Sequence, residues 1–159
     1  MNRINQILKH DAYLEHLIKI QGLEADRIFC KHDLVHFLDV CRIAWILTLE
    51  EQRSLEKEWV YAAGLLHDIG RWAQYEQGVD HALESGRLCL HILEDCGFAV
   101  EEQILIQRAI VSHRKGAPEM EDLASVLFRA DKLSRNCWMC AASNQCNKIE
   151  NGGLPPLQY

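Results

Sequence analysis

The sequence has little proline and contains no low-complexity tract, internal repeat or linker. Only 3 of its 159 residues are proline, whereas 48% are apolar and 25% are charged. This balance is ordinary for a folded helical chain and argues against a disordered or fibrous protein. A chain of this length can bury one core but is short for two, so we predict a single domain over residues 1–159.

Long apolar runs are also missing. No stretch approaches the roughly 20 apolar residues that cross a bilayer. The segment Met1–Gln6 is polar and lacks the apolar core of a signal peptide. We therefore expect a cytoplasmic protein without a membrane partner.

A net positive charge is lacking as well. The formal charge is -6 and the pI is about 5.7, so no overall positive field attracts a nucleic-acid backbone. We do not expect nucleic acid as a partner, although individual basic side chains can still bind the phosphates of a small molecule.

No alternation of apolar and polar residues requires a strand, and apolar residues recur instead at intervals of three and four. We predict an all-α helical bundle in which Asp33, Ser54 and Asp80 cap helices. Residues 71–79 are expected to form a loop, and the tail a short helix with an extended end. The expected helices run from Ile4 to about Gly22, from Leu34 through Trp45, from Ser54 to Leu66, from His81 to a stop at Gly97, from about Val100 to His113, and around Leu123 to Ala130.

The stretch Leu65-Leu66-His67-Asp68-Ile69-Gly70-Arg71 places two adjacent polar residues at the end of an apolar helix face. Burying an imidazole and a carboxylate without partners costs several kcal/mol, so something must satisfy them. Both are common metal ligands, although a capping role would also account for Asp68. A metal site therefore requires matching ligands elsewhere in the chain.

Residues of the same chemistry recur near helix ends and on apolar helix faces. They are His36, His81, His113 and Asp131. Any one of these residues, considered alone, could equally be a buried histidine or a capping aspartate that only stabilises the fold. Together, imidazoles and carboxylates favour iron, manganese, zinc or nickel over calcium, and a shared carboxylate can hold two cations close enough to activate a water. Hydrolysis of a phosphate ester or anhydride is the natural reaction of such a centre.

The ordered set resembles the HD-domain superfamily of metal-dependent phosphohydrolases over about residues 29–135, with residues 136–159 as a cysteine-containing extension. The resemblance rests on His36-Phe37-Leu38-Asp39-Val40, on the stretch from Leu65 to Gly70, and on the later aspartate. It implies an HD-domain helical bundle in which one metal is held by His36, His67, Asp68 and Asp131. It also implies a second metal, held by His81 and His113 and bridged by Asp68, as in the binuclear branch.

Residues 109–113 and the spacing from His113 to Asp131 are similar to small bacterial HD proteins that cleave diadenosine tetraphosphate using iron. The resemblance therefore implies two divalent transition metals, with iron first and manganese, zinc or nickel as alternatives, and a small phosphorylated or nucleotide substrate. Two other functions stay open on the same ligands. One is an HD-type di-iron oxygenase, and the other is a non-catalytic sensor or interaction module stabilised by metals.

Basic residues follow the ligand positions closely in the sequence. Arg71 comes directly after Gly70, and Arg114, Lys115 and Lys132 follow ligands. We expect them, Arg71 first, to contact substrate phosphates, against the alternative of solvated or salt-bridged side chains. For Lys132, pairing with the adjacent carboxylate is a further alternative.

His32 lies one turn before His36 and is expected to act as an outer proton donor or phosphate contact. The predicted catalytic residues are thus Asp68, as the bridging ligand, together with Arg71, His32 and Lys132.

The cysteine count is odd, at 7, in a chain without an export signal, which favours reduced thiols or metal ligands over disulfides. Cys137, Cys140 and Cys146 cluster in the tail, and Cys30 is a candidate fourth ligand. Together they form a candidate structural zinc or iron-sulfur site. Free thiols are the alternative. Four cysteines in or beside apolar helical patterns are expected to be buried: Cys30, Cys41, Cys89 and Cys96.

Overall fold

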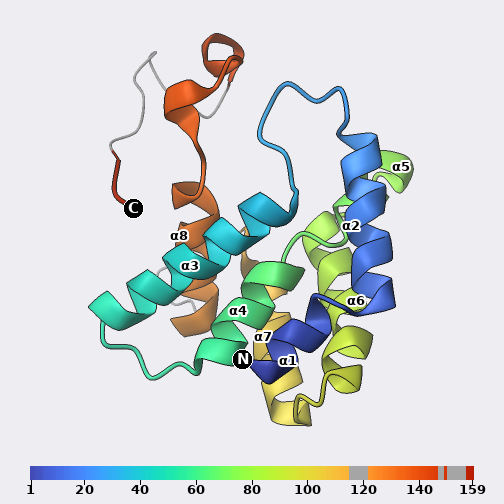
Figure 1. Ribbon diagram of the computed structural model, residues 1–159, viewed down its shortest axis with the longest axis vertical. Coiled ribbons are helices and arrows are strands. Elements are labelled where there is room, and N and C mark those ends of the chain that lie inside the picture. The colour runs from blue at the N-terminus through green and yellow to red at the C-terminus, as the bar shows by residue number, and fades with distance from the viewer. Residues whose placement is uncertain (115–121, 147–148, 150–156) are drawn as a thin grey trace.

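The computed structural model of the protein describes residues 1–114, 122–146, 149 and 157–159 (Figure 1). Within these ranges the chain is helical and has no strand, which confirms the predicted all-α class. Two 3-10 turns, η1 (Cys137–Met139) and η2 (Ser143–Gln145), follow the helices. The helices are α1 (Asn2–Ile7), α2 (Asp11–Leu23), α3 (Leu34–Glu50), α4 (Lys57–Leu66), α5 (Arg71–Gln77), α6 (His81–Asp95), α7 (Val100–Ser112) and α8 (Asp122–Leu133).

Helix α4 lies at the centre of the bundle, and α3 lies on one side of it (Figure 1). They pack against each other, and both contact α8, while α4 also contacts α7. Gly64 allows the close approach of α4 to α3, because a Cβ at this position would lie 2.5 Å from Cys41 Sγ. Helix α6 packs on α7, and α5 lies between α6 and α2.

A continuous apolar core joins α1 to α4 with α6 to α8. Phe37, Leu65, Leu66 and Ile69 are fully buried in it. Each such side chain contributes about 1.5–3 kcal/mol by its burial. Because Leu66 and Ile69 flank the pair His67 and Asp68, this burial also turns the two polar residues inward.

The expected helix from Ile4 to about Gly22 is interrupted, so that prediction was wrong. Helix α1 ends at Ile7, and α2 begins at Asp11. His10 lies between them and caps α2, because its Nδ1 accepts a hydrogen bond from Ala12 N–H at 3.2 Å. Apolar spacing continues across this break, which is why the pattern did not reveal it.

The expected caps of α3 and α6 are confirmed, since Asp33 accepts from His36 N–H at 2.9 Å and Asp80 accepts from Ala82 N–H at 2.8 Å. The expected cap Ser54 was wrong. Helix α4 starts at Lys57, and its N-cap residue, Glu56, makes no side-chain capping bond.

We predicted a loop over residues 71–79, and this prediction was wrong, because most of these residues form helix α5. Helix α5 carries mixed polar residues and buries only Ala73 fully, so its sequence shows little apolar periodicity. It ends at Gly78, which adopts a φ of 71°, a left-handed conformation that glycine tolerates best.

None of the helices in the described part of the chain is long and apolar enough to cross a bilayer. The η1 and η2 segment lies at one end of the molecule, near the connection between α2 and α3 (Figure 1). The C-terminal residue returns to the bundle, where Tyr159 O–H donates to Glu50 Oε2 at 2.8 Å.

Candidate metal centre

Residues 67–70 form the turn between α4 and α5, and this turn packs closely against α6. Gly70 N–H donates to Ser85 Oγ at 2.9 Å, and a Cβ on Gly70 would lie 2.5 Å from the backbone nitrogen of Ser85. A side chain at residue 70 would therefore force the turn away from α6. The close packing brings His67 and Asp68 next to His81.

Asp68 lies among imidazoles on both of its carboxylate oxygens. Its Oδ2 is 3.4 Å from His67 Nε2, whereas its Oδ1 is 3.1 Å from His81 Nε2 and 3.5 Å from His113 Nε2. The residue is only 3% exposed. The two oxygens thus face two different groups of histidines.

The first group consists of His36, His67 and Asp68, whose ligand atoms all lie within 4.8 Å of one another. Asp131, in the last turn of α8, lies beside it, with Oδ1 3.7 Å from His36 Nε2. The residues expected to hold a first metal are therefore gathered from α3, the turn after α4, and α8.

The second group consists of Asp68, His81 and His113, and meets the same 4.8 Å spacing. His81 is the first residue of α6, and His113 is the C-cap of α7. All six ligands predicted from the sequence are thus brought to one place, and Asp68 belongs to both groups.

In each of the four histidines, Nδ1 faces an oxygen atom while Nε2 faces a carboxylate. In His36, His67 and His113, an Nδ1–H that donates to this oxygen leaves Nε2 unprotonated, which is the form that binds a metal. The Nδ1 contacts are His67 with Gly64 O at 2.8 Å, His113 with Ile110 O at 2.6 Å, His36 with Ser134 Oγ at 3.3 Å, and His81 with Gln74 Oε1.

Several polar atoms of the centre are buried without a hydrogen bond from the described residues. They are His36 Nε2, His67 Nε2 and Asp68 Oδ1. Buried polar atoms are nearly always satisfied in folded proteins. Unsatisfied nitrogen and oxygen lone pairs that converge in this way fit a bound transition metal.

The protonation states also suit a metal. Burial lowers the pKa of His67 to about 4, and it lowers the pKa of His36 and of His81. Burial alone would raise the pKa of Asp68, but the surrounding imidazoles keep it well below its usual value. His113 differs, because the negative charge of Asp68 outweighs burial and raises its pKa. Neutral imidazoles and an ionised carboxylate are the forms that bind divalent metals.

His32 borders the centre from the connection before α3, with Nε2 3.5 Å from Asp68 Oδ2. Glu24 holds it in place, since its carboxylate lies 2.5 Å from His32 Nδ1 and accepts the His32 backbone N–H at 2.6 Å. Tyr75 O–H donates to the same carboxylate. Burial opposes ionisation of Glu24, but its bonds to His32 and Tyr75 lower its pKa to about 2.

The centre opens into a cavity of about 540 Å³ that is rich in positive charge. Asp68 and Asp131 are the only carboxylates that line it among the described residues. The local charge is therefore opposite to the net charge of the chain. The cationic side chains lining the cavity are Arg27, Arg71, Arg114, Lys132 and Arg135.

The basic side chains expected to contact phosphates differ in the partners that they already have. Arg71 lies over His81, with Nη1 2.9 Å from its Nδ1. Arg114 pairs with Asp80 at 2.8 Å, and Lys132 Nζ donates to Asp131, as its alternative role required. Lys115 lies outside the described residues.

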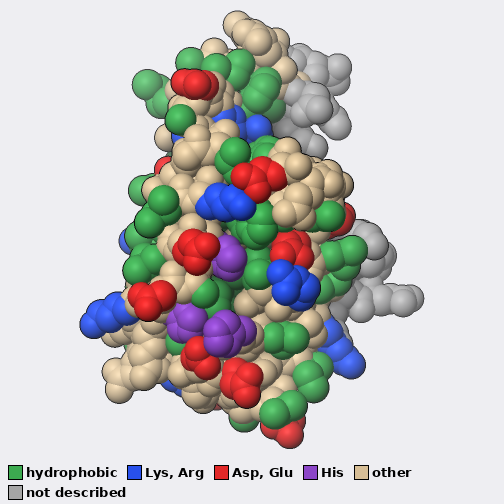
Figure 2. Space-filling view, turned by 90° about the vertical axis from the view of Figure 1, so that its right-hand side faces the viewer, with side chains coloured by type: hydrophobic (Ala, Val, Ile, Leu, Met, Phe, Trp, Pro, Cys, Tyr) green, Lys and Arg blue, Asp and Glu red, His purple; other side chains and the backbone are tan. Residues whose placement is uncertain are grey.

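A third possible ligand group, His10, His91 and Asp95, lies away from the centre. Because His10 Nδ1 accepts the hydrogen bond that caps α2, its Nε2 carries the proton and donates to Asp95 at 3.1 Å. That arrangement leaves no free lone pair on His10 for a metal. Figure 2 shows the side of the molecule where α2, α5 and α6 lie, with surface histidines next to carboxylates and charges of both signs interspersed.

Known proteins resemble the chain over most of its length. Residues 33–136 match the HD domain family. An uncharacterized protein of Clostridium beijerinckii is 42% identical over 147 residues, which cover 92% of each chain. Ribonuclease Y of Lactobacillus gasseri is 26% identical over 119 residues, which cover 74% of this chain but only 20% of the ribonuclease.

The fold resembles the crystal structure of a predicted HD superfamily hydrolase from an uncultured Thermotogales bacterium. The TM-score is 0.56 with 26% sequence identity, and the match covers 76% of this chain and 66% of that one. This likeness supports metal-dependent hydrolysis in general. The family match spans all six candidate ligands, from His36 to Asp131, and the chain belongs to the HD domain family.

Proposed function

We propose that the protein is a phosphohydrolase that uses two divalent metals to cleave a phosphate ester or anhydride of a small nucleotide-like substrate. One observation carries the proposal: Asp68 is shared by two histidine groups within a cavity lined by cationic side chains. The shared carboxylate favours two metals, and the surrounding positive charge favours a phosphorylated substrate.

The residues that would hold the metals follow from the two groups. His36, His67, Asp68 and Asp131 would bind one, and Asp68 would bind the other with His81 and His113. Iron is the first candidate, and manganese, zinc or nickel also suit these ligands. When bound, such metals lower the pKa of a water and offset negative charge on a phosphoryl oxygen.

The cavity suits a small molecule that carries more than one phosphate. Its volume lies within the range of small-molecule sites. Phe29 lines it, is 37% exposed, and has the Arg27 guanidinium 5.8 Å from its ring centre. An exposed aromatic face can stack on a nucleobase while neighbouring cations bind phosphates. RNA as substrate does not follow from ribonuclease Y, because the chain spans only a fifth of that enzyme.

His32 is the residue best placed to move a proton. It borders the cavity and is anchored through Nδ1 by Glu24, so its Nε2 faces the reaction site. An imidazole held in this way can donate a proton to the oxygen that leaves the phosphorus. Arg71 and Lys132 lie along the same cavity and would orient the phosphates.

We expect Glu24→Gln to slow turnover while leaving the metal content unchanged. Glutamine keeps the size of the side chain but removes the charge that holds His32. Loss of a partner that orients a residue beside a metal centre costs on the order of 10–100-fold in activity. Steady-state kinetics with metal analysis measures the effect, and Glu15→Gln, at an exposed site on α2, which ends just before Glu24, is the control. An unchanged kcat/KM would remove His32 from the mechanism.

The proposed function is tested by metal analysis of anaerobically purified protein, followed by a phosphate-release screen on the same sample. We expect two metals per chain and hydrolysis of at least one nucleotide or phosphate ester. Oxygen-dependent turnover would favour the di-iron oxygenase instead. A folded, fully metallated protein that hydrolyses no member of a broad panel would favour the sensor or interaction module.

A further inference from the structure

Four cysteines gather at one edge of the candidate metal centre. Cys137 is the first residue of η1, Cys140 is the C-cap of η1, and Cys146 is the C-cap of η2. Cys30 comes from the connection between α2 and α3, far away in the sequence. Cys30 and Cys146 line the same cavity, and the η1 and η2 segment lies next to the connection that contains Cys30 (Figure 1).

Two consecutive tight turns position the three cysteines of the tail. Cys140 N–H donates to Cys137 O at 3.3 Å, and Cys146 N–H donates to Ser143 O at 3.2 Å. Ser143 N–H donates to Cys140 O at 3.1 Å and joins the turns. A Cys-x-x-Cys pair within a tight turn has the spacing of ligands in structural zinc sites.

The other cysteines differ from these four. Cys41, Cys89 and Cys96 are at most 3% exposed, as the helical pattern predicted. The thiols of Cys41 and Cys89 each donate to a backbone carbonyl at 3.3 Å. Within the described ranges, no thiol of the four gathered cysteines makes such a bond, and Cys30 is exposed. Packing therefore does not account for where these four lie.

Hydrophobic burial contributes little to fixing the tail. Neither η1 nor η2 contains a buried residue, and Trp138 and Met139 are 54% and 85% exposed. Ala142 is the one buried side chain in residues 135–146. Short segments without an apolar core commonly depend on a bound metal for their structure.

We infer that Cys30, Cys137, Cys140 and Cys146 bind one structural zinc ion that fastens the tail to the connection between α2 and α3. Four thiolates fill the tetrahedral coordination of zinc and leave no open position for substrate. Burial raises the pKa of the Cys30 and Cys137 thiols, and the positive charge of Arg135 offsets part of that rise. Among the described residues, no three of these sulfur atoms lie within 4.8 Å of one another. Zinc binding would therefore draw the tail and the connection between α2 and α3 closer together.

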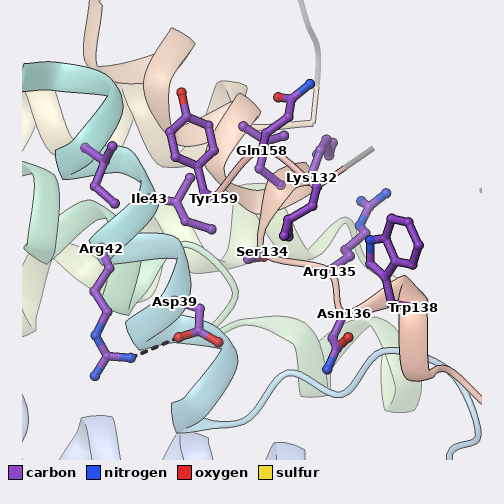
Figure 3. A pocket seen from close by; sticks show the side chains of 13 residues that line it. Asp39, Arg42, Ile43, Lys132, Ser134, Arg135, Asn136, Trp138, Gln158 and Tyr159 are labelled. Carbon is purple, nitrogen blue, oxygen red and sulfur yellow. Dashed lines mark hydrogen bonds and ion pairs between the residues drawn. The ribbon is translucent and has the colours of Figure 1, made fainter. Parts of the chain in front are cut away.

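Residues of the segment that zinc would fasten line two cavities. Gln145 and Cys146, together with Cys30, line the cavity of the metal centre. Trp138 and Asn136 line a second cavity of about 450 Å³, which Figure 3 shows next to Arg42 and Asp39 on α3. The zinc would thus fix one wall of the candidate active site, and this inference does not depend on the reaction proposed for that site.

The test compares the unmutated protein with Asp68→Ala. Both are full-length chains that are supplied with zinc and purified under reducing conditions. Asp68→Ala removes the shared ligand of the other centre. X-ray absorption should show zinc bound by sulfur at about 2.3 Å in both proteins. Elemental analysis of Asp68→Ala should give one zinc per chain, because this variant lacks the shared ligand of the other centre. Cys140→Ser should lose it, whereas Met139→Ser, a substitution at an exposed position of the same turn, should keep it.

Cys140→Ser could lose zinc because the substitution disturbs the folding of the tail itself. Cys30→Ser is therefore the second variant, since Cys30 lies outside the tail, in the connection between α2 and α3. Circular dichroism should show that the helices persist in both, while limited proteolysis should cut the tail faster than in Met139→Ser. The inference is overturned if the unmutated protein holds no sulfur-bound zinc, if either cysteine variant keeps it, or if the thiols bind iron or form disulfides.

Discussion

Asp68→Ala is expected to release both metals and to abolish phosphate release. The carboxylate of Asp68 faces His67 on one oxygen and His81 and His113 on the other, so its loss removes a ligand from both groups at once. Even outer partners of metal ligands cost about 10–100-fold when they are removed. Loss of a ligand shared by two metals should exceed that range, as measured by elemental analysis and steady-state kinetics.

The control for this variant is Asp39→Ala, which removes an exposed aspartate on α3 that pairs with Arg42. It should keep both metals and full activity. Circular dichroism of Asp68→Ala should show the helices of the unmutated protein, because the apolar neighbours Leu66 and Ile69 keep their packing. Normal turnover in Asp68→Ala would refute the proposed mechanism.

The six candidate ligands could be predicted because the sequence resembles the HD-domain superfamily, and the apolar neighbours of His67 and Asp68 had already indicated that pair. Leu66 and Ile69 are apolar, so the polar pair between them must turn inward with its neighbours. The predicted helix start at His81 is correct, since Asp80 caps the helix that begins there. The sequence therefore predicted which residues meet, although it contained no information on the distances between them.

Glu24 could not be predicted in the same way. It contacts His32 across an irregular connection and Tyr75 across a long stretch of chain. No helical period relates these positions, and an acidic residue at a helix end normally indicates a solvated group. Its burial becomes evident only once α2 and α5 are placed side by side.

The position of Cys30 shows the same limitation. Its helical pattern favoured a buried thiol, but the residue is exposed in an irregular connection because α2 ends at Leu23 and α3 begins only at Leu34. Helix α5 was missed because its length and position are set by contacts with α2 and α6 rather than by an apolar stripe. In each case tertiary contacts outweigh the local pattern.

His81→Ala is expected to reduce the metal content from two to one per chain and to lower turnover by more than about 100-fold. His81 belongs only to the second ligand group, so the group of His36, His67 and Asp68 should keep its metal. A single remaining metal can still bind a phosphate, but it lacks the partner that would share Asp68. Substrate binding should therefore weaken less than turnover falls.

The matched control is His91→Ala, an exposed histidine on the same helix as His81 and outside the centre. It should leave metal content and kinetics unchanged. His36→Ala tests the other half, because it should lose the first metal and keep the second at His81 and His113. If the unmutated protein binds only one metal, the bridge through Asp68 does not form. If His81→Ala keeps two metals, His81 is not a ligand of the second one, and the proposed second group is wrong.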